Sequence, residues 1–226
     1  MKQDIWETKF SDNYSPSFFI RLVQRFEVNR KQVIRQLIPE SGGSVIDLAC
    51  GNGELLFSIS GKYKKLLGLD IAKNRIKKAI DKHHQTDKVQ FENVDLDKGI
   101  PAKNGSCDLV ICEASLGYLY DTSFILKEIN RVLKKGGYFI VEVPNYAYLT
   151  RRIALLLGNL PRTSAFSGYG DGGAIHYFTI KVLEKLLNES DFKVEIITNS
   201  GVFCKFRRLY PPLLAPNIII KAIKQK

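Results

Sequence analysis

The amino-acid sequence predicts an α/β fold: a doubly wound, mostly parallel β-sheet with helices on both of its faces. Between residues 44 and 143, short apolar segments of strand length alternate with longer segments whose apolar residues recur every three or four positions. Such an alternation requires a parallel sheet that is covered on both faces. Glycine-rich or acidic residues follow four of the predicted strands. Because right-handed crossovers place the carboxyl ends of parallel strands at one edge, these residues should converge on a single crevice.

The elements up to residue 143 are predicted from their apolar spacing. Residues 16–38 have the period of an amphipathic helix, which Pro39 and the glycine pair Gly42–Gly43 end. The run Lys134–Gly137 supplies the basic residues and glycines that are typical of a helix C-terminus. Strands are expected at residues 44–48, 65–70, 89–94, 107–112 and 138–143, and helices at 53–62, 72–84 and 122–134.

After residue 143 the regular alternation stops. An insert at residues 144–178 contains an apolar stretch at 153–157 and a glycine-rich loop at 167–178. No internal repeat or low-complexity linker interrupts the 226 residues, so we expect one domain. A helix at 179–190 and strands at 192–198 and 217–223 complete the predicted elements.

The composition is that of a globular protein without membrane spans. Hydrophobic residues make up 45% of the chain and charged residues 25%. No apolar run reaches the roughly 20 residues of a membrane span, and the first residues lack the apolar region of a signal peptide. We therefore expect a cytoplasmic protein. The four cysteines form no Cys-x-x-Cys pair, so we expect reduced structural thiols and no metal site.

The formal net charge of +11 is unevenly distributed along the chain. Residues 61–82 hold eight Lys or Arg against two Asp, and six Lys or Arg with no acid follow Glu195. A solvated helix face explains the first group. A basic field also favours encounters with anionic partners, although it does not identify them.

The most informative motif lies between the first predicted strand and its helix. Asp47 precedes Ala49, Gly51 and Gly53, and the two glycines lack a Cβ, so the backbone can approach a ligand closely there. Seventeen residues after Gly53, the second strand ends in Asp70, whose carboxylate can accept hydrogen bonds from both hydroxyls of a ribose. A nicotinamide site is disfavoured because its third glycine position is Leu56 here. The motif therefore predicts a crevice for a nucleoside.

This pattern resembles the class I S-adenosylmethionine-dependent methyltransferases, whose first strand ends in an acidic-x-Gly-x-Gly-x-Gly motif. Ala49 replaces the first glycine. Over about residues 44–223 the resemblance implies a Rossmann-like, seven-stranded sheet with an antiparallel last strand, and S-adenosylmethionine as the cofactor. Asp47 would stabilise the glycine turn or meet the cofactor's ammonium group, with a simple turn-capping role as the alternative. Asp70 would bind the ribose, and a cap for the following helix can coexist with that role.

The resemblance also assigns residues after the next two strands. Asp95 would accept from the adenine amino group, with Leu96 and Ile71 packing on the ring; the alternatives are a turn aspartate and ordinary core residues. Glu113 would line the methionine end of the cofactor. The sequence around it, Cys112–Ser115, differs from the Asn/Asp-Pro-Pro-Tyr/Phe of adenine-N6 and glutamine methyltransferases. Methylation of those groups is therefore disfavoured, and a small-molecule acceptor is favoured.

Candidate acceptor residues follow the fifth strand and precede the first helix. His176, in the glycine-rich loop, is the candidate general base, because a histidine near neutrality can take a proton from a hydroxyl or amine. A half-buried histidine that hydrogen-bonds the loop backbone is the equal alternative. Tyr118 and Tyr177 are expected to face the acceptor, and Tyr14 to contact it from an N-terminal lid, unless these residues only pack.

Basic and apolar residues of the insert suggest an acceptor that is anionic or lipid-linked. Arg152, with its neighbours Arg151 and Arg162, would hold a phosphate, carboxylate or sugar-phosphate group; a solvated surface or a membrane-facing edge is the alternative. Residues 153–157 and 209–214 would allow peripheral contact with a bilayer, although ordinary core packing is favoured.

The sequence therefore predicts an S-adenosylmethionine-dependent methyltransferase that acts on a hydroxyl or amine of a small molecule: a sugar, a quinone precursor or a lipid-linked glycan. An RNA methyltransferase is the alternative that the charge motivates, although no appended RNA-binding module is found. A non-catalytic relative that binds the cofactor is the third reading. The expected parts are an N-terminal helical cap (1–43), a cofactor-binding half (44–143), a substrate-side insert (144–178) and the C-terminal helix and strands (179–226).

Overall fold

A computed structural model describes residues 27–161, 174–202 and 210–225. Tyr14, Arg162, most of the glycine-rich loop and the first part of the predicted helix at 16–38 lie outside these described residues.

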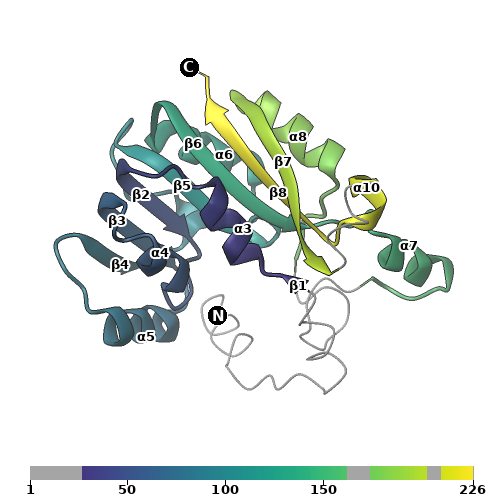
Figure 1. Cartoon of the computed structure of the whole chain (residues 1–226), viewed down its shortest axis with the longest axis horizontal. Helices are drawn as coiled ribbons and strands as arrows, with labels where there is room; N and C mark the ends of the chain where they lie inside the picture. Colours follow the sequence, from purple (N-terminus) through teal and green to yellow (C-terminus); the bar gives the residue numbers. More distant parts are fainter. Residues whose placement is uncertain (1–26, 162–173, 203–209, 226) are drawn as a thin grey trace.

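The described strands form one sheet in the order β1-β7-β8-β6-β5-β2-β3-β4 (Figure 1). Neighbours among β2 to β6 pair in parallel, whereas β8 is antiparallel to both β6 and β7. The predicted mostly parallel sheet with an antiparallel last strand is thus confirmed, and the two-residue β1 adds to it. The strands are β1 (Glu27–Val28), β2 (Gly42–Leu48), β3 (Tyr63–Asp70), β4 (Val89–Asn93), β5 (Cys107–Glu113), β6 (Leu133–Pro144), β7 (Phe192–Val202) and β8 (Asn217–Lys224).

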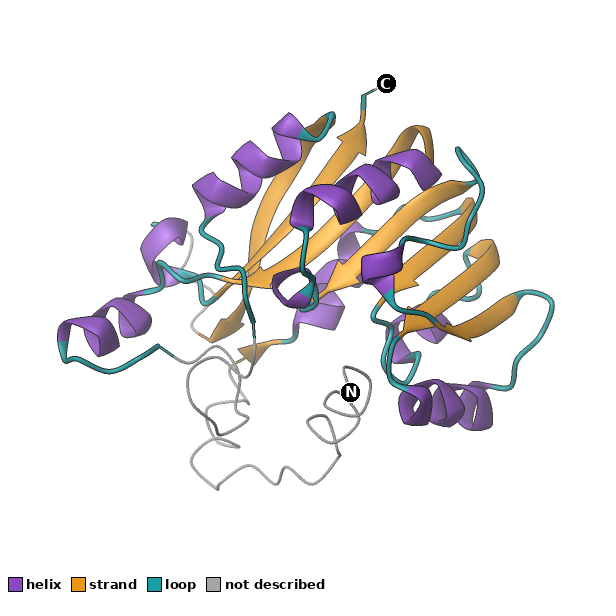
Figure 2. Ribbon diagram, turned by 180° about the vertical axis from the view of Figure 1, so that it is seen from behind, coloured by secondary structure: helices purple, strands orange, loops and turns teal. Residues whose placement is uncertain are grey.

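Helices cover both faces of the sheet, as predicted (Figures 1 and 2). Apolar side chains of α6 and α8 pack on one face, and those of α3, α4 and α5 pack on the other. This burial removes the apolar stripe of each helix from water. The helices are α3 (Arg30–Leu37), α4 (Glu54–Ser58), α5 (Lys73–His83), α6 (Thr122–Val132), α7 (Leu149–Leu156), α8 (Ile180–Glu189) and α10 (Pro211–Leu214), with short 3-10 turns η1 (Leu96–Lys98) and η2 (Leu116–Tyr118).

The prediction of one continuous helix over residues 16–38 is wrong at residues 27–29. Glu27 and Val28 pair with β7, and helix α3 begins only at Arg30. Asn29 is extended, and its side chain accepts a hydrogen bond from the Lys31 amide at 2.8 Å. An asparagine at this position satisfies a helix N-terminus better than it continues a helix.

The predicted helix C-terminus at Lys134–Gly137 is also wrong. Helix α6 ends at Val132, and the fully buried Leu133 already pairs with Cys107 in the sheet. The register then shifts before Leu109 pairs with Tyr138, and Gly136 has a φ of +76° within this irregularity. The glycines therefore permit a bulge in β6, because a positive φ is unfavourable for other residues.

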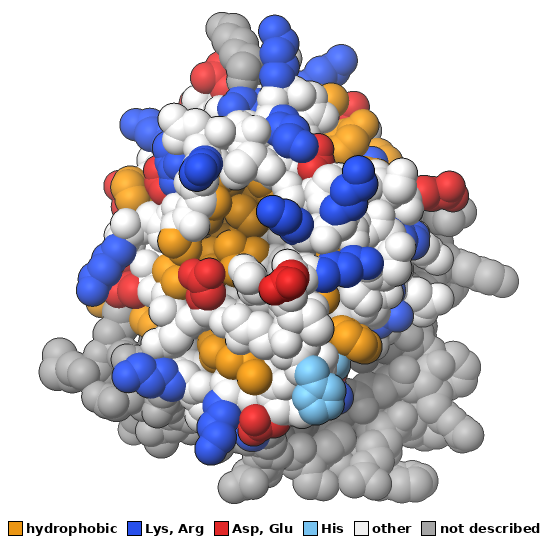
Figure 3. All heavy atoms as spheres, turned by 90° about the vertical axis from the view of Figure 1, so that its left-hand side faces the viewer, with side chains coloured by type: hydrophobic (Ala, Val, Ile, Leu, Met, Phe, Trp, Pro, Cys, Tyr) orange, Lys and Arg blue, Asp and Glu red, His pale blue; other side chains and the backbone are white. Residues whose placement is uncertain are grey.

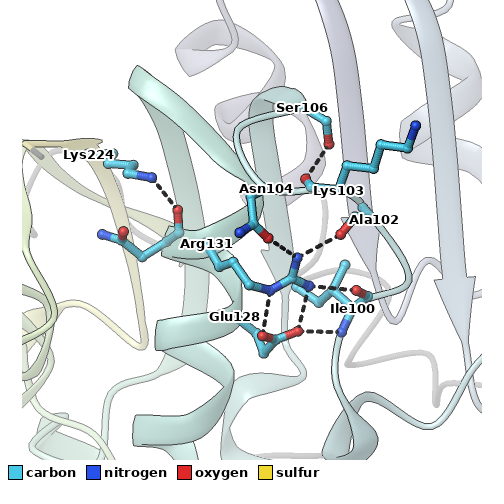
Figure 4. Close-up of polar contacts among 9 residues, drawn as sticks. Ile100, Ala102, Lys103, Asn104, Ser106, Glu128, Arg131 and Lys224 are labelled. Atoms are coloured by element: carbon cyan, nitrogen blue, oxygen red, sulfur yellow. Dashed lines mark hydrogen bonds and ion pairs between the residues drawn. The ribbon is translucent and has the colours of Figure 1, made fainter.

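A polar network fixes the segment that leads from η1 to β5 (Figure 4). Arg131 of α6 binds both oxygens of Glu128 and donates to the carbonyls of Ile100 and Ala102, at 2.7–2.8 Å. The Glu128 carboxylate also accepts from the Ile100 amide at 2.9 Å. The hydrogen bond from Arg131 lowers the pKa of Glu128. Charge-assisted, bidentate contacts of this kind hold the segment between η1 and β5 in one conformation.

Candidate functional site

A cavity of about 410 Å³ opens at the carboxyl ends of β2, β3 and β5. Strand order reverses at this point, since β3 lies on one side of β2 and β5 on the other. The structure thus brings the ends of separate strands together where the sequence expects a crevice. The predicted residues that line the cavity are Ala49, Gly51, Asp70, Ile71, Asp95, Leu96, Glu113 and Tyr118.

Asp70 connects the glycine turn to helix α5. Its Oδ2 accepts from the Gly51 amide at 2.9 Å, and its Oδ1 accepts from the Ala72 amide at the start of α5, also at 2.9 Å. The side chain is 4% exposed and still lines the cavity. Each carboxylate oxygen has a further lone pair, so the helix-capping contact leaves acceptor capacity toward a ligand.

Two alanines on the cavity wall have left-handed backbone conformations. Ala49 has a φ of +56° and Ala114 has a φ of +53°. This conformation costs an L-residue roughly 1–2 kcal/mol. Backbone strain of this kind concentrates at ligand sites, where the surrounding structure holds the residue in place.

Gly53 lies beside the cavity and does not line it. Its φ is +72°, and a Cβ added there would approach Cε1 of the Phe91 ring to 2.5 Å. Glycine is therefore required at this position by the packing of α4 against β4. Gly51 differs, because a Cβ there would meet only the Arg75 guanidinium, at 3.5 Å.

Three carboxylates share the sheet face beneath α3. Glu113 and Glu142 are paired residues of β5 and β6, and Asp47 pairs with Ile111, two residues before Glu113. Asp47 is 2% exposed, and burial, followed by repulsion from Glu113 and Asp70, raises its pKa well above the usual value. Like charges at close range favour a cationic ligand or a bound proton.

Glu142 is the most deeply buried of these carboxylates. It is 1% exposed, and neither of its carboxylate oxygens has a hydrogen-bond partner among the described residues. Burial, chiefly, and the neighbouring Glu113 raise its pKa to about 7, against the opposing effects of Arg30 and Arg151. Sequence reasoning missed Glu142, although an acid inside the apolar run of β6 is a detectable signal.

Arg30, from the first turn of α3, is the basic residue that binds Glu113 of this acidic group. Its Nε donates to Glu113 Oε1 at 2.5 Å. Nothing in the sequence near Arg30 points to this contact, which depends on how α3 packs across the sheet. Sequence reasoning also missed Glu54 on the rim, where a hydrogen bond from Lys31 and another from Lys82 lower its pKa to about 2.

The opposite end of the cavity is mainly apolar. Ile71, Val94 and Leu96 line it beside Asp95. Asp95 is also a turn aspartate, which is the alternative role expected from the sequence. Its Oδ1 accepts a hydrogen bond from the Asp97 amide at 3.3 Å and so caps η1.

The candidate acceptor residues are not all gathered at the cavity. Tyr118 lines it. His176 lies beside η2, because its amide donates to the Gly117 carbonyl at 3.1 Å. Its Nε2 is 3.0 Å from the carbonyl oxygen of Tyr120, which lies outside the glycine-rich loop. Tyr177 is 53% exposed and packs against the Tyr146 ring. Arg152 is exposed and donates to the Ala147 carbonyl, so the structure places it outside the cavity.

The lysines of α5 form a solvated helix face, as predicted for the basic residues between positions 61 and 82. Lys73, Lys77, Lys78 and Lys82 are exposed. Figure 3 shows Lys and Arg side chains on this side of the molecule dispersed among acidic and uncharged ones.

The described part of the chain contains neither a metal-ligand cluster nor a helix that could span a membrane. No group of three His, Cys, Asp or Glu residues there is placed to hold a metal ion. No helix there has both the length and the hydropathy needed to cross a bilayer.

Comparisons with known proteins agree with this geometry. A family model described as a methyltransferase domain matches residues 39–165. A demethylmenaquinone methyltransferase from Bacillus cereus (strain B4264) is 28% identical over 141 residues, which are 59% of this chain and 58% of that protein. The chain thus spans less than two thirds of the curated relatives it matches.

Solved structures share the fold. An S-adenosylmethionine-dependent methyltransferase from Mesorhizobium loti superposes with a TM-score of 0.65 at 19% identity, over 85% of this chain and 96% of that one. A magnesium protoporphyrin IX methyltransferase from Synechocystis PCC 6803, solved with bound SAH, gives 0.64 at 16% identity, over 98% and 93%. Because the family model covers more than half of the chain, the resemblance drawn from Asp47 to Asp70 is confirmed, and the chain belongs to the class I S-adenosylmethionine-dependent methyltransferase family.

Proposed function

We propose that this methyltransferase uses the cavity for S-adenosylmethionine and transfers a methyl group to a hydroxyl or amine of a small molecule. The observation that carries the proposal is the arrangement of Asp70 with the Gly51 turn at the switch point of the sheet. Among small acceptors we favour a quinone precursor, because the relatives at 28% identity have demethylmenaquinone in their names.

The residues of the cavity fit the parts of the cofactor. The apolar end, with Ile71, Leu96 and the Asp95 carboxylate, suits an adenine ring and its amino group. Asp70 retains acceptor capacity for the ribose hydroxyls. Near Glu113, a cationic methionine end would favour the ionised forms of Asp47 and Glu142, whose pKa values burial raises.

The bound cofactor would supply an activated methyl group on its sulfonium. The chain would then hold two reactants in line and exclude water, and orientation of this kind can account for about 7–11 kcal/mol of a barrier. We infer that Tyr118 contributes to the acceptor side, because it lines the same cavity. His176 as a base stays a prediction: the Tyr120 carbonyl can only accept, so Nε2 would carry the hydrogen there and Nδ1 would be the ring nitrogen that takes a proton from the acceptor.

Gly51→Ala with Gly105→Ala as its matched control tests the cofactor site. Both glycines have nearly the same φ, +57° and +58°, so both variants should lose similar stability. Only Gly51 lines the cavity, where its methyl group would occupy ligand space. We expect titration calorimetry to show at least about ten-fold weaker S-adenosylmethionine binding for Gly51→Ala only, a change of about 1.4 kcal/mol. Equal affinities, or no heat with the wild-type protein, would contradict the proposed site.

The acceptor class needs a separate experiment. Purified protein with radiolabelled S-adenosylmethionine would be offered quinone precursors, sugars, lipid-linked glycans and transfer RNA, and the labelled product would be identified by mass analysis. We expect label in a small-molecule fraction. Label in transfer RNA, with binding that weakens steeply as salt rises, would support the RNA alternative instead.

A further inference from the structure

Helix α7 has the reverse of the usual arrangement of a surface helix. Its one buried residue is Arg151, at 8% exposure. Its apolar side chains face outward: Ile153 is 45% exposed, Leu155 54% and Leu156 86%. The exposure continues beyond the helix, in Leu157 at 72% and Leu160 at 69%. Surface helices normally bury the apolar side and expose the charges.

The orientation of α7 is fixed by the contacts of Arg151. The guanidinium donates to the carbonyls of Asn145 and Pro216, at 2.5 and 2.7 Å, and lies over the rings of Tyr146 and Tyr148. Asn145 follows the last residue of β6 and Pro216 immediately precedes β8, so the arginine binds both strands at one end of the antiparallel β6–β8 pair. The leucines of α7 therefore face outward because the hydrogen bonds of Arg151 fix how the helix is attached to the sheet.

The sequence around these leucines has basic but no acidic residues. Between Glu142 and Asp171 it contains three arginines, of which Arg151 is buried and Arg162 lies outside the described residues. Arg152 is exposed on α7 itself. The whole chain carries a net charge of +11. An apolar surface with an exposed arginine and no acidic residue in its segment, on a chain of net positive charge, complements the headgroups and outer acyl region of an anionic lipid bilayer.

The position of α7 relates this surface to the site. The helix follows the carboxyl end of β6, which is parallel to β5 and ends at the same edge of the sheet as the cavity. Figures 1 and 2 both show α7 projecting from that edge, away from the sheet. A surface that contacted α7 would lie beside the strand ends from which the cavity is built.

We propose that the outward apolar surface of α7 and the turn after it, Ile153 to Leu160, docks this protein on anionic lipid bilayers. The docking is independent of methyl transfer and goes beyond the proposed function. If the acceptor is lipid-linked, docking brings the cavity edge to the surface in which that acceptor is embedded.

Vesicle sedimentation of the full chain without cofactor tests the docking. We expect binding to vesicles of phosphatidylcholine with about 30% phosphatidylglycerol, weak binding to pure phosphatidylcholine, and a decrease as salt rises. The double variant Leu156→Glu/Leu157→Glu should reduce binding by about ten-fold or more. The matched control is Val182→Glu, which changes another exposed apolar residue, 50% exposed on α8, and should bind as the wild type does.

Several outcomes would overturn the docking. They are the absence of wild-type binding, equal binding by the double variant and the wild type, and equal loss in the control. A wild-type dimer in light scattering that the double variant dissociates, with no vesicle binding, would assign the surface to a second copy of the chain. If the double variant unfolds, Leu160→Glu, outside the helix, provides the same comparison. Cofactor binding measured on the same variants separates a failure of docking from a failure of the cavity.

Discussion

The two halves of the sheet's carboxyl edge are built differently. Around β2, β3 and β4 the polar groups are bonded to backbone: Asp70 holds two amides, and Asn93 donates to the carbonyls of Asp70 and Ile71. Beyond β6 the insert exposes leucines on α7, and Tyr177 is half exposed. The first half determines the shape of a cavity through its backbone, whereas the second half presents side chains on a surface.

The difference indicates how one fold can combine a shared donor with varied acceptors. A cavity whose walls are strand ends and turns depends on local sequence. Acceptor contacts depend on inserted segments, which can change without disturbing the strands. If the two halves differ in this way, packing and charge constrain the residues of the donor side, and substitutions on the acceptor side have small effects on stability and cofactor binding.

The largest expected effect is at Glu142 of β6, which belongs to the donor side because it pairs with Glu113 of the cavity wall. Its usual pKa of 4.5 is raised to about 7 in the folded protein, so the folded state retains a proton that the unfolded chain loses. The contribution of Glu142 to the free energy of unfolding should therefore fall by about 3 kcal/mol as pH rises from 4.5 to about 7, and level off above that. Glu142→Gln removes this loss.

Urea unfolding at about pH 5 and about pH 8 measures the effect of Glu142. The Gln variant should be the more stable protein at the higher pH only. If the free energies of unfolding of the wild type and the variant change with pH in the same way, the Glu142 carboxyl does not titrate as its burial implies. Its burial would then not destabilise the folded protein at high pH.

A smaller effect is expected at Gly53, relative to Gly105. Both have a positive φ, but a Cβ at Gly53 would overlap the Phe91 ring, whereas one at Gly105 would meet nothing within 4 Å. Gly53→Ala should therefore lose about 2 kcal/mol more stability than Gly105→Ala, as overpacking typically costs. Urea midpoints of the two variants give the comparison, and equal losses would mean that α4 and β4 adjust easily.

The smallest effect is expected on the acceptor side, from His176→Ala. The variant loses one hydrogen bond to the Tyr120 carbonyl, worth about 1 kcal/mol, and its cofactor affinity should stay within about two-fold of the wild type. Activity with an identified acceptor separates the two readings of this residue: a large loss in kcat supports a base, and an unchanged kcat supports a structural histidine. A large loss of cofactor affinity would break the proposed separation of the two halves.

The fold and the cavity floor were predictable because their signals are local. The Asp47–Gly53 turn and Asp70 are each one short segment, and the parallel topology then brings them together. Arg30 was not predictable, because its contact with Glu113 spans 83 residues and depends on the placement of α3. Arg151 is similar: its burial depends on a carbonyl of Pro216, which no periodicity reveals. Where a polar side chain has a distant backbone partner, apolar patterning assigns it to the wrong side of a helix.

The double contact of Asp70 has a consequence for hydrogen exchange. One carboxylate holds the amide protons of Gly51 and Ala72, which lie on separate turns. If that side chain rotates away, both protons are released to solvent in the same event. A molecule that engages Asp70 from the cavity would then slow deuterium uptake at both positions together, so the two amides would report occupancy as a pair.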